Sequence, residues 1–203
     1  MRRSPNPDER QRDADRSRQQ LLDAAVAEFG AHGFSGARVS EIARRAGVNK
    51  QLISYYFGGK QGLYEAVAER WRAGEPKVTA GAITLADLVA AYARVTLAQP
   101  DLARLLIRQG VDRDAIGVDE EAQTARFRAM LEDFRQRQEK GELAADLDPA
   151  YVGLALFAMS AAPVVFPQIA HALGLDPGDP KFAEAYANQL LRVVNRLAEE
   201  PED

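Results

Sequence analysis

Two short helical patterns joined by a glycine turn, within residues 39–57, constrain the fold of this chain more than any other feature. The first pattern has apolar residues at the i, i+3, i+4, i+7 spacing of an amphipathic helix: Val39, Ile42, Ala43 and Ala46. Gly47 follows, at the position where a left-handed residue ends a helix. The side-chain oxygen of Asn49 can then cap a second helix. Two short helices joined by such a turn predict a helix-turn-helix.

The second helix of this motif has two faces of different character. Its apolar face is expected to pack against the first helix through Leu52, Ile53 and Tyr56. The opposite face carries Lys50, Gln51, Ser54 and Tyr55. A lysine can reach guanine acceptors or a phosphate, a glutamine can pair with adenine, and tyrosines offer hydroxyl groups to phosphates. This face therefore has the chemistry of a recognition helix.

The next three residues, Gly58, Gly59 and Lys60, open a further helix. Backbone N–H groups and an ammonium group then lie together, and this combination favours phosphate binding. Helix–glycine–helix segments are also common in all-α proteins in which they only pack. The spacing alone therefore leaves a DNA-binding and a purely structural interpretation open.

The order of these motifs resembles that of a known family. The chain has Ile-Ala at 42–43, Ala-Gly-Val at 46–48, Tyr-Tyr-Phe at 55–57, and Lys60 before an apolar helix. This run closely resembles the N-terminal domain of the TetR family of transcriptional regulators, over about residues 16–72. The resemblance implies an all-α protein, in which a three-helix helix-turn-helix DNA-binding domain precedes a helical ligand-binding and dimerisation domain.

The resemblance also extends the set of candidate DNA contacts. Ser17 stands at the expected N-cap of the first helix, which lies close to the DNA backbone in the family. Arg38 stands where the family often has Thr or Ser. Because an arginine cannot accept a backbone N–H, its phosphate contact would be ionic. The candidate DNA-binding residues are Ser17, Arg38, Ser40, Asn49, Lys50, Gln51, Ser54, Tyr55, Tyr56 and Lys60.

The charge of the chain is divided unevenly between its two parts. Residues 1–60 carry 11 Lys and Arg against 7 Asp and Glu, whereas residues 61–203 carry 15 against 23. The positive excess coincides with the helix-turn-helix although the net charge is −4. The chain has no cysteine, and its two histidines are far apart in sequence. We therefore expect no disulfide, no metal site and no cofactor.

Two further classes of protein are disfavoured. We find no Gly-rich phosphate loop, nucleophile elbow or HExxH motif, so no catalytic residues are assigned and we expect the protein not to be an enzyme. There is no 18-residue apolar stretch and no run that resembles a signal peptide. We expect a cytoplasmic protein that does not bind a membrane.

The domains are predicted in the following order. Residues 1–15 are polar, contain two prolines and are expected to form a disordered arm. Residues 16–74 should form the DNA-binding domain, from a first helix over 16–32 to a fourth helix over 60–74. Gly74, Pro76 and Gly81 mark a break. Residues 82–199 should form the second domain, with helices near 84–99, 101–110, 119–140, 149–173 and 180–199.

The last two of these helices are predicted to begin with an acid before a proline, at Asp148-Pro149 and Asp179-Pro180. The stretch 152–166 is unusually apolar but too short to cross a membrane. We expect it to be buried on both sides, by a pocket and by a partner subunit, although a simple monomer core is the alternative. The resemblance implies a homodimer formed through the last two helices. Pro163 and Pro167 should kink or interrupt the first of them.

Large apolar side chains at helical spacing supply the candidate pocket residues, although such stripes are more often packing. They are Trp71, Tyr92, Phe127, Met130, Phe134, Phe157, Met159 and Phe166. As a set they predict a largely apolar small-molecule effector.

The function predicted is that of a ligand-responsive transcriptional regulator, a repressor that binds a palindromic operator in double-stranded DNA as a homodimer. Its recognition helices would enter successive major grooves about 34–36 Å apart. The alternative is a helical interaction protein without specific DNA binding, which would leave the polar face of residues 50–55 unexplained.

Overall fold

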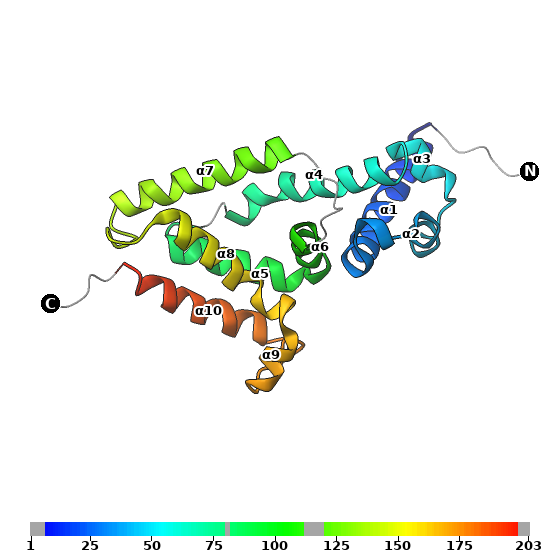
Figure 1. Ribbon diagram of the computed structural model, residues 1–203. Helices are drawn as coiled ribbons and strands as arrows, with labels where there is room; N and C mark the ends of the chain where they lie inside the picture. The colour runs from blue at the N-terminus through cyan, green and yellow to red at the C-terminus, as the bar shows by residue number, and fades with distance from the viewer. Residues whose placement is uncertain (1–6, 80–81, 112–119, 199–203) are drawn as a thin grey trace, which may run out of the picture. The chain divides into compact units, whose positions relative to one another are not determined.

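The computed structural model describes residues 7–79, 82–111 and 120–198, and every regular element in these ranges is a helix (Figure 1). The all-α prediction is confirmed. The helices are α1 (Pro7–Gly36), α2 (Val39–Ala46), α3 (Gln51–Phe57), α4 (Lys60–Thr79), α5 (Leu85–Ala98), α6 (Pro100–Val111), α7 (Glu120–Glu139), α8 (Pro149–Val165), α9 (Pro167–Ala172) and α10 (Phe182–Asn195). None of these helices is long and apolar enough to cross a membrane.

The helices belong to two compact units. The first comprises Met1–Ala73 with Arg104–Val118, and the second comprises Gly74–Ala103 with Asp119–Asp203. The first unit therefore includes a segment well beyond the 16–74 range in which the DNA-binding domain was expected.

A small apolar core holds α1 to α4 together in the first unit. The buried side chains are Leu21, Leu22, Ala25, Phe29, Ile42, Ile53, Leu63, Tyr64 and Val67. Phe34 closes this core, because its ring centroid lies 5.1 Å from that of Tyr64 and 6.2 Å from that of Phe29. The apolar stripes predicted for α1, α2 and α4 thus meet in one place.

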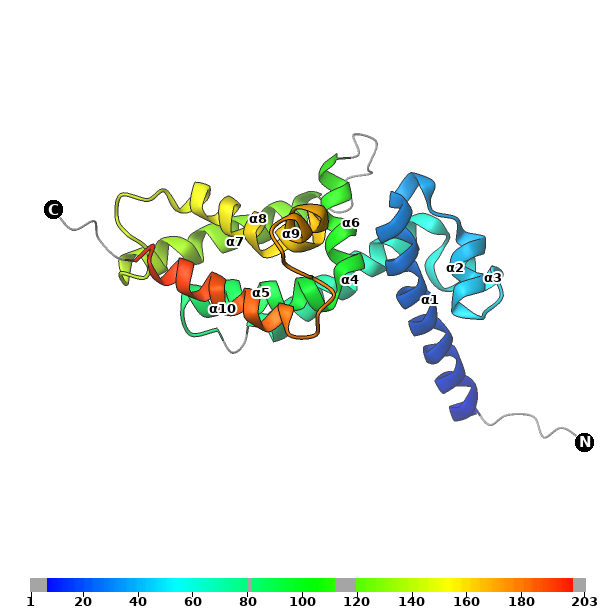
Figure 2. The same ribbon diagram turned by 90° about the horizontal axis from the view of Figure 1, so that it is seen from below.

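Helix α1 begins earlier than the sequence analysis predicted. It starts at Pro7, so residues 7–15 are helical and the prediction of a disordered arm is wrong for them; residues 1–6 lie outside the described residues. A proline suits the first position of a helix, since its fixed φ is already helical. Figure 2 shows these first turns extending away from α2 and α3. At its other end α1 breaks at Gly33 (φ 68°), as predicted.

Helix α4 continues farther than predicted. It passes through Gly74 and Pro76 and ends at Thr79, so the expected end near residue 74 is wrong. Glycine and proline lower the stability of a helix, but adding residues to an established helix is far easier than nucleating one.

The second unit is a set of packed helices around α5. Helix α5 packs against α10 and α8, and α8 packs against α7 (Figures 1 and 2). The centre of the core is formed by Leu85, Leu88, Val89, Phe134, Leu156, Leu190 and Val194.

The helix starts in this unit follow the predicted capping chemistry. The Asp148 side chain accepts the Ala150 amide at 2.8 Å, as expected for an N-cap. The Asp179 side chain accepts the Lys181 amide at 2.8 Å in the same way. Helix α10 itself begins at Phe182, two residues later than the predicted Pro180.

The long apolar helix predicted over 149–173 is divided, and it is not buried on both sides within one chain. Helix α8 ends at Val165 and α9 begins at Pro167, which confirms the predicted interruption. Leu156 and Val164 are buried, but Tyr151 and Leu154 are 77% and 69% exposed on the other side of α8. The exposed side is the one that a partner subunit was expected to cover, so burial on both sides stays a prediction.

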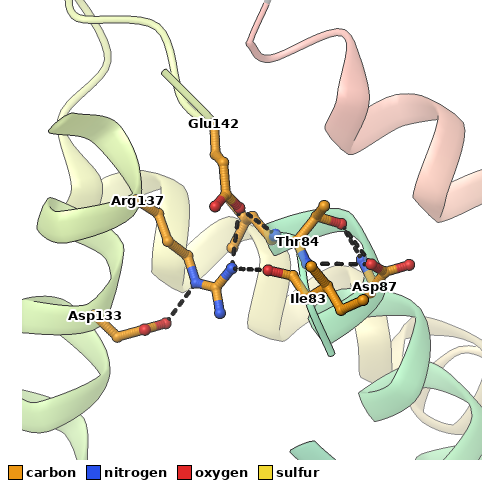
Figure 3. Close-up of polar contacts among 7 residues, drawn as sticks. Ile83, Thr84, Asp87, Asp133, Arg137 and Glu142 are labelled. Atoms are coloured by element: carbon orange, nitrogen blue, oxygen red, sulfur yellow. Dashed lines mark hydrogen bonds and ion pairs between the residues drawn. The ribbon is translucent and has the colours of Figure 1, made fainter. Parts of the chain in front are cut away.

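A polar cluster joins the end of α7 to the start of α5 (Figure 3). The Arg137 guanidinium donates to Asp133 at 2.8 Å, to Glu142 at 2.9 Å and to the Ile83 carbonyl at 3.2 Å. Glu142 also accepts the Leu85 amide at 2.6 Å. A capping box adds to this junction, because Thr84 exchanges hydrogen bonds with Asp87.

Candidate nucleic-acid interface

The turn between α2 and α3 has the geometry that the sequence predicts. Gly47 adopts a left-handed conformation (φ 68°, ψ 26°) and its N–H is directed to the carbonyl groups of Ala43 and Arg44. The Asn49 side-chain oxygen accepts the Gln51 amide at 2.8 Å. Asn49 therefore caps α3 as predicted, which makes its oxygen part of the scaffold of this surface.

Helix α3 separates its side chains as expected. Ile53 is buried, whereas Leu52 and Tyr56 are half-buried. Lys50, Gln51, Ser54 and Tyr55 are exposed, and Tyr55 reaches 79% exposure. The Tyr56 ring lies between those of Tyr55 and Phe57, at centroid distances of 5.1 and 6.2 Å. The exposed face of α3 is therefore polar, and its opposite face packs into the apolar core through Ile53.

The turn between α3 and α4 depends on glycines. Gly58 (φ 71°) and Gly59 (φ 126°) have conformations that L-amino acids with side chains rarely adopt. Gly62, in the first turn of α4, lies so close to α3 that an added Cβ would stand 1.9 Å from the Phe57 carbonyl oxygen. These residues bring Lys60, at the start of α4, next to the end of α3.

Lys60 is held in a defined position by the segment that follows the Gly33 break. Its Nζ donates to the Ser35 carbonyl at 3.2 Å and lies 4.9 Å from the centroid of the Phe34 ring. Burial of the ammonium holds the pKa of Lys60 below its ordinary value of 10.5. A phosphate that approached it would compensate this burial with an opposite charge.

An open hollow lies where α2, α3 and α4 begin. Its volume is about 370 Å³, and it is lined by Ala37, Arg38, Val39, Ser40, Lys50, Ile53, Ser54, Gly59 and Lys60. Three of these side chains are cations and two are hydroxyls, from separate segments of the chain. A concave surface of cationic and hydroxyl donors suits a phosphate group. The structure therefore brings together five of the candidate DNA contacts, namely Arg38, Ser40, Lys50, Ser54 and Lys60.

The remaining candidates lie in other places. Gln51 and Tyr55 project from α3, Tyr56 is half-buried behind them, and Asn49 forms the cap. Ser17 is not an N-cap, because α1 begins ten residues before it; its hydroxyl donates to the Asp13 carbonyl within the helix at 2.8 Å. The structural basis on which Ser17 was selected is therefore wrong.

Glu28 is not among the residues predicted from the sequence. This acid shares the apolar face of α1 with Leu21 and Ala25, at the spacing of a core residue, and it is 2% exposed. An acid at a core position is the sequence signal that could have revealed it, because carboxylates are rarely buried without a partner.

The candidate effector residues fall into several groups. Phe134 is buried in the core of the second unit, and Tyr92, Met130 and Met159 pack against that core. The rings of Phe127 and Phe157 are in contact at 6.1 Å. Phe166 is half exposed between α8 and α9, and Trp71 belongs to the first unit, where its indole N–H is buried without a hydrogen-bond partner.

Comparisons with known proteins agree for both units. Residues 21–67 match the model of bacterial regulatory proteins of the tetR family, and residues 84–196 match that of the tetracyclin repressor-like C-terminal domain. The chain is 31% identical to the HTH-type transcriptional repressor SCO4008 of Streptomyces coelicolor, over 91% of this chain and 98% of the relative.

Solved structures give the same fold. The structure of the transcriptional regulator SCO4942 from Streptomyces coelicolor is similar, with a TM-score of 0.72 and 27% identity over 89% of this chain and 97% of that one. The fatty acid degradation regulator FadR from Bacillus halodurans has a TM-score of 0.64 at 20% identity, over 87% of this chain and 97% of that one.

Proposed function

The chain belongs to the tetR family of bacterial regulatory proteins, and from this premise we propose that it acts as a homodimeric repressor. It binds a near-palindromic operator through the hollow and the exposed face of α3, and an apolar small molecule releases it. The observation that carries the proposal is the convergence of three cations and two hydroxyls beside the recognition helix.

The hollow receives a phosphate of the DNA backbone. Arg38, Lys50 and Lys60 supply the charge, while Ser40 and Ser54 supply hydroxyl donors. Such contacts fix the position of the protein on the duplex without reading its sequence. They also make the affinity fall steeply with salt, because each neutralised phosphate releases counterions.

The sequence of the operator is read by the exposed end of α3. Gln51 and Tyr55 are exposed on α3 and do not line the hollow. A glutamine can form two hydrogen bonds with adenine in the major groove, and a tyrosine ring edge can contact a thymine methyl. Gln51 is the residue that we expect to determine base preference most directly.

Dimerisation uses the exposed apolar sides of α8 and α10, the last two long helices. Tyr151, Leu154 and Phe157 on α8 and Val193 on α10 are exposed in the single chain. Large exposed apolar side chains on these two helices favour burial against another subunit. Leu154→Glu should therefore convert the dimer to a monomer in sedimentation experiments. Ile83→Glu is the control, because Ile83 is 84% exposed and lies outside these helices.

The effector binds in the second unit, beside the side chains that surround Phe134. Tyr92, Met130 and Met159 provide an adaptable apolar lining, and Gly153 lets α8 approach α7 closely, since its added Cβ would stand 3.4 Å from Phe134. Binding there favours a pose of the dimer in which the recognition helices no longer match the operator. A coupling free energy of about 1–3 kcal/mol is typical of such a switch.

The alternative of a helical interaction protein that does not bind DNA loses its basis, since the matched family consists of regulatory proteins. We assign no enzymatic activity to the chain and place it in the cytoplasm with its DNA. In the described residues no cluster of three or more metal-binding side chains occurs.

The experiment that tests this function is selection of bound duplexes from random DNA, followed by titration of the enriched duplex with apolar compounds. A palindrome with half-sites about one helical turn apart would support recognition of the operator by a homodimer. Binding to all duplexes alike, with no enriched sequence, would refute specific operator recognition.

A further inference from the structure

The buried acid Glu28 is not used by any step described so far. Its side chain is enclosed by the first unit, and its Oε2 atom has no hydrogen-bond partner. Burying a carboxylate is costly unless charge and hydrogen bonds compensate it. Its surroundings therefore indicate why an acid occupies this position.

The Oε1 atom of Glu28 accepts the backbone N–H of Arg38 at 3.2 Å. Arg38 is the residue immediately before α2; its backbone is extended (φ −115°, ψ 121°), and its side chain does not cap the helix. The hydrogen bond thus fixes the backbone at the point where α2 begins. Glu28 reaches this point from α1, ten residues earlier in the chain.

In a capping box this backbone N–H would be bonded by an acid three residues into the helix. Glu41 occupies that position in α2, but its carboxylate is bonded to the Arg44 guanidinium instead. Glu28 therefore supplies from another helix the contact that α2 does not supply for itself. Its negative charge also complements the positive end of the α2 dipole.

Two basic side chains lie on the other side of the Glu28 carboxylate. Arg45 Nη2 lies 3.7 Å from Oε2, and His32 Nε2 lies 4.0 Å from it. Both partners are partly exposed, while the acid is not. The Arg45 guanidinium offsets the burial of the Glu28 charge, and Oε1 stays directed at the Arg38 amide.

Arg38 and Ser40 form one wall of the hollow, and Glu28 supports that wall from inside the unit. We propose that Glu28 is a positioning residue for DNA binding, whose carboxylate holds the start of α2 so that Arg38 and Ser40 face a backbone phosphate. The proposal rests on the proposed function, because it assumes that DNA binds at the hollow.

Two conservative variants separate the hydrogen bond from the charge. Glu28→Gln keeps the length of the side chain and an oxygen acceptor but removes the charge. Glu28→Asp keeps the charge but withdraws the oxygen from the Arg38 amide. If Glu28 acted only through its charge, Glu28→Gln would change the affinity for DNA and Glu28→Asp would not. Positioning requires the opposite result.

We expect Glu28→Asp to weaken binding to the selected duplex about tenfold, the size of effect that loss of a helix cap produces. Glu28→Gln should stay within about twofold of the wild type. Glu41→Gln is the matched control, since it removes an exposed acid of the same motif that does not contact the Arg38 amide, and it should leave the affinity unchanged. Wild-type affinity for Glu28→Asp, or an equal loss in Glu28→Gln, would overturn the proposal.

Hydrogen exchange in the DNA-free protein gives a second readout. The Arg38 amide should exchange faster in Glu28→Asp than in the wild type or in Glu28→Gln. If the wild type binds no duplex at all, the proposed function fails, and the exchange rates still show whether Glu28 holds this amide. Equal exchange in all three proteins would refute the positioning role itself.

Discussion

Arg137 offers the sharpest test of what holds the second unit together. Replacing it by alanine removes three hydrogen bonds at once, to Asp133, Glu142 and the Ile83 carbonyl (Figure 3). The Arg137 side chain is only 14% exposed, and Glu142 is 25% exposed, so solvent screens this pair little. Asp133 is 45% exposed and should contribute little.

The expected cost follows from these burials. A hydrogen bond to a charged group contributes about 1.5–3 kcal/mol, and the loss of one partner of a largely buried ion pair costs more than that of an exposed one. We therefore expect Arg137→Ala to lower the free energy of unfolding by about 2–4 kcal/mol. Because Glu142 also accepts the Leu85 amide, the start of α5 should loosen as well.

The assay is urea denaturation followed by circular dichroism, with Arg135→Ala as the matched control. Arg135 is on the same helix, but its pair with Glu132 is long, at 3.6 Å, and well exposed on both sides. Its removal should cost less than about 0.5 kcal/mol. Equal midpoints for Arg135→Ala and Arg137→Ala would refute the claim that the cluster at the α5–α7 junction stabilises the unit.

Three further predictions concern the interface and the helix caps. Lys60→Ala should weaken binding to all duplexes alike and reduce the slope of log affinity against log salt concentration by about one unit per subunit. Gln51→Ala should instead change which bases the protein prefers. A changed base preference in Lys60→Ala would contradict its role as a phosphate contact. Gly62→Ala should destabilise the protein by about 1–3 kcal/mol, because its Cβ would clash with the end of α3. Gly74→Ala, in the same helix but with open space around it, should stabilise the protein. The midpoints of thermal unfolding test both, and equal midpoints for the two variants would be inconsistent with the close approach of α3 and α4. The pKa of Asp87 lies below its ordinary value of 3.8, since the capping box donates hydrogen bonds to it, so its contribution to stability is complete above that value and is lost as the pH falls through the folded pKa. Asp87→Asn should remove the loss of stability that Asp87 causes as the pH falls below 3.8, measured as the midpoint of urea unfolding at each pH. An unchanged pH dependence in Asp87→Asn would show that Asp87 does not contribute it.

The sequence was sufficient wherever structure follows from neighbouring residues. The Gly47 turn, the Asn49 cap and the separation of the α3 faces depend on contacts within about four residues, and all three predictions are confirmed. The interruption between α8 and α9 follows similarly from Pro167, which begins a new helix.

Prediction from composition was less successful than prediction from capping chemistry. The polar composition of residues 7–15 predicts a disordered arm, whereas Pro7 followed by two acids is a signal for the start of the helix that forms there. The break expected at Gly74 and Pro76 was inferred from residue type alone, and α4 continues through it. In both places helix propagation prevailed over average residue preference.

Contacts between distant segments could not be predicted from one sequence. Glu28 bonds the Arg38 amide, and Arg137 bonds the Ile83 carbonyl, 54 residues away. Nothing in the local pattern around Arg137 distinguishes it from Arg135, since both occur on a charged helix. Only the packing of α7 beside the start of α5 gives the two arginines different roles.

The central claim is that the hollows of the two subunits each bind a backbone phosphate of the same operator. Ethylation-interference footprinting of the wild type and of Lys60→Ala on the selected duplex tests it most directly. We predict two symmetric clusters of essential phosphates, centred about 34–36 Å apart, with at least one phosphate in each cluster that ceases to be essential in Lys60→Ala. A footprint without two-fold symmetry, or one that Lys60→Ala leaves unchanged, would contradict the claim.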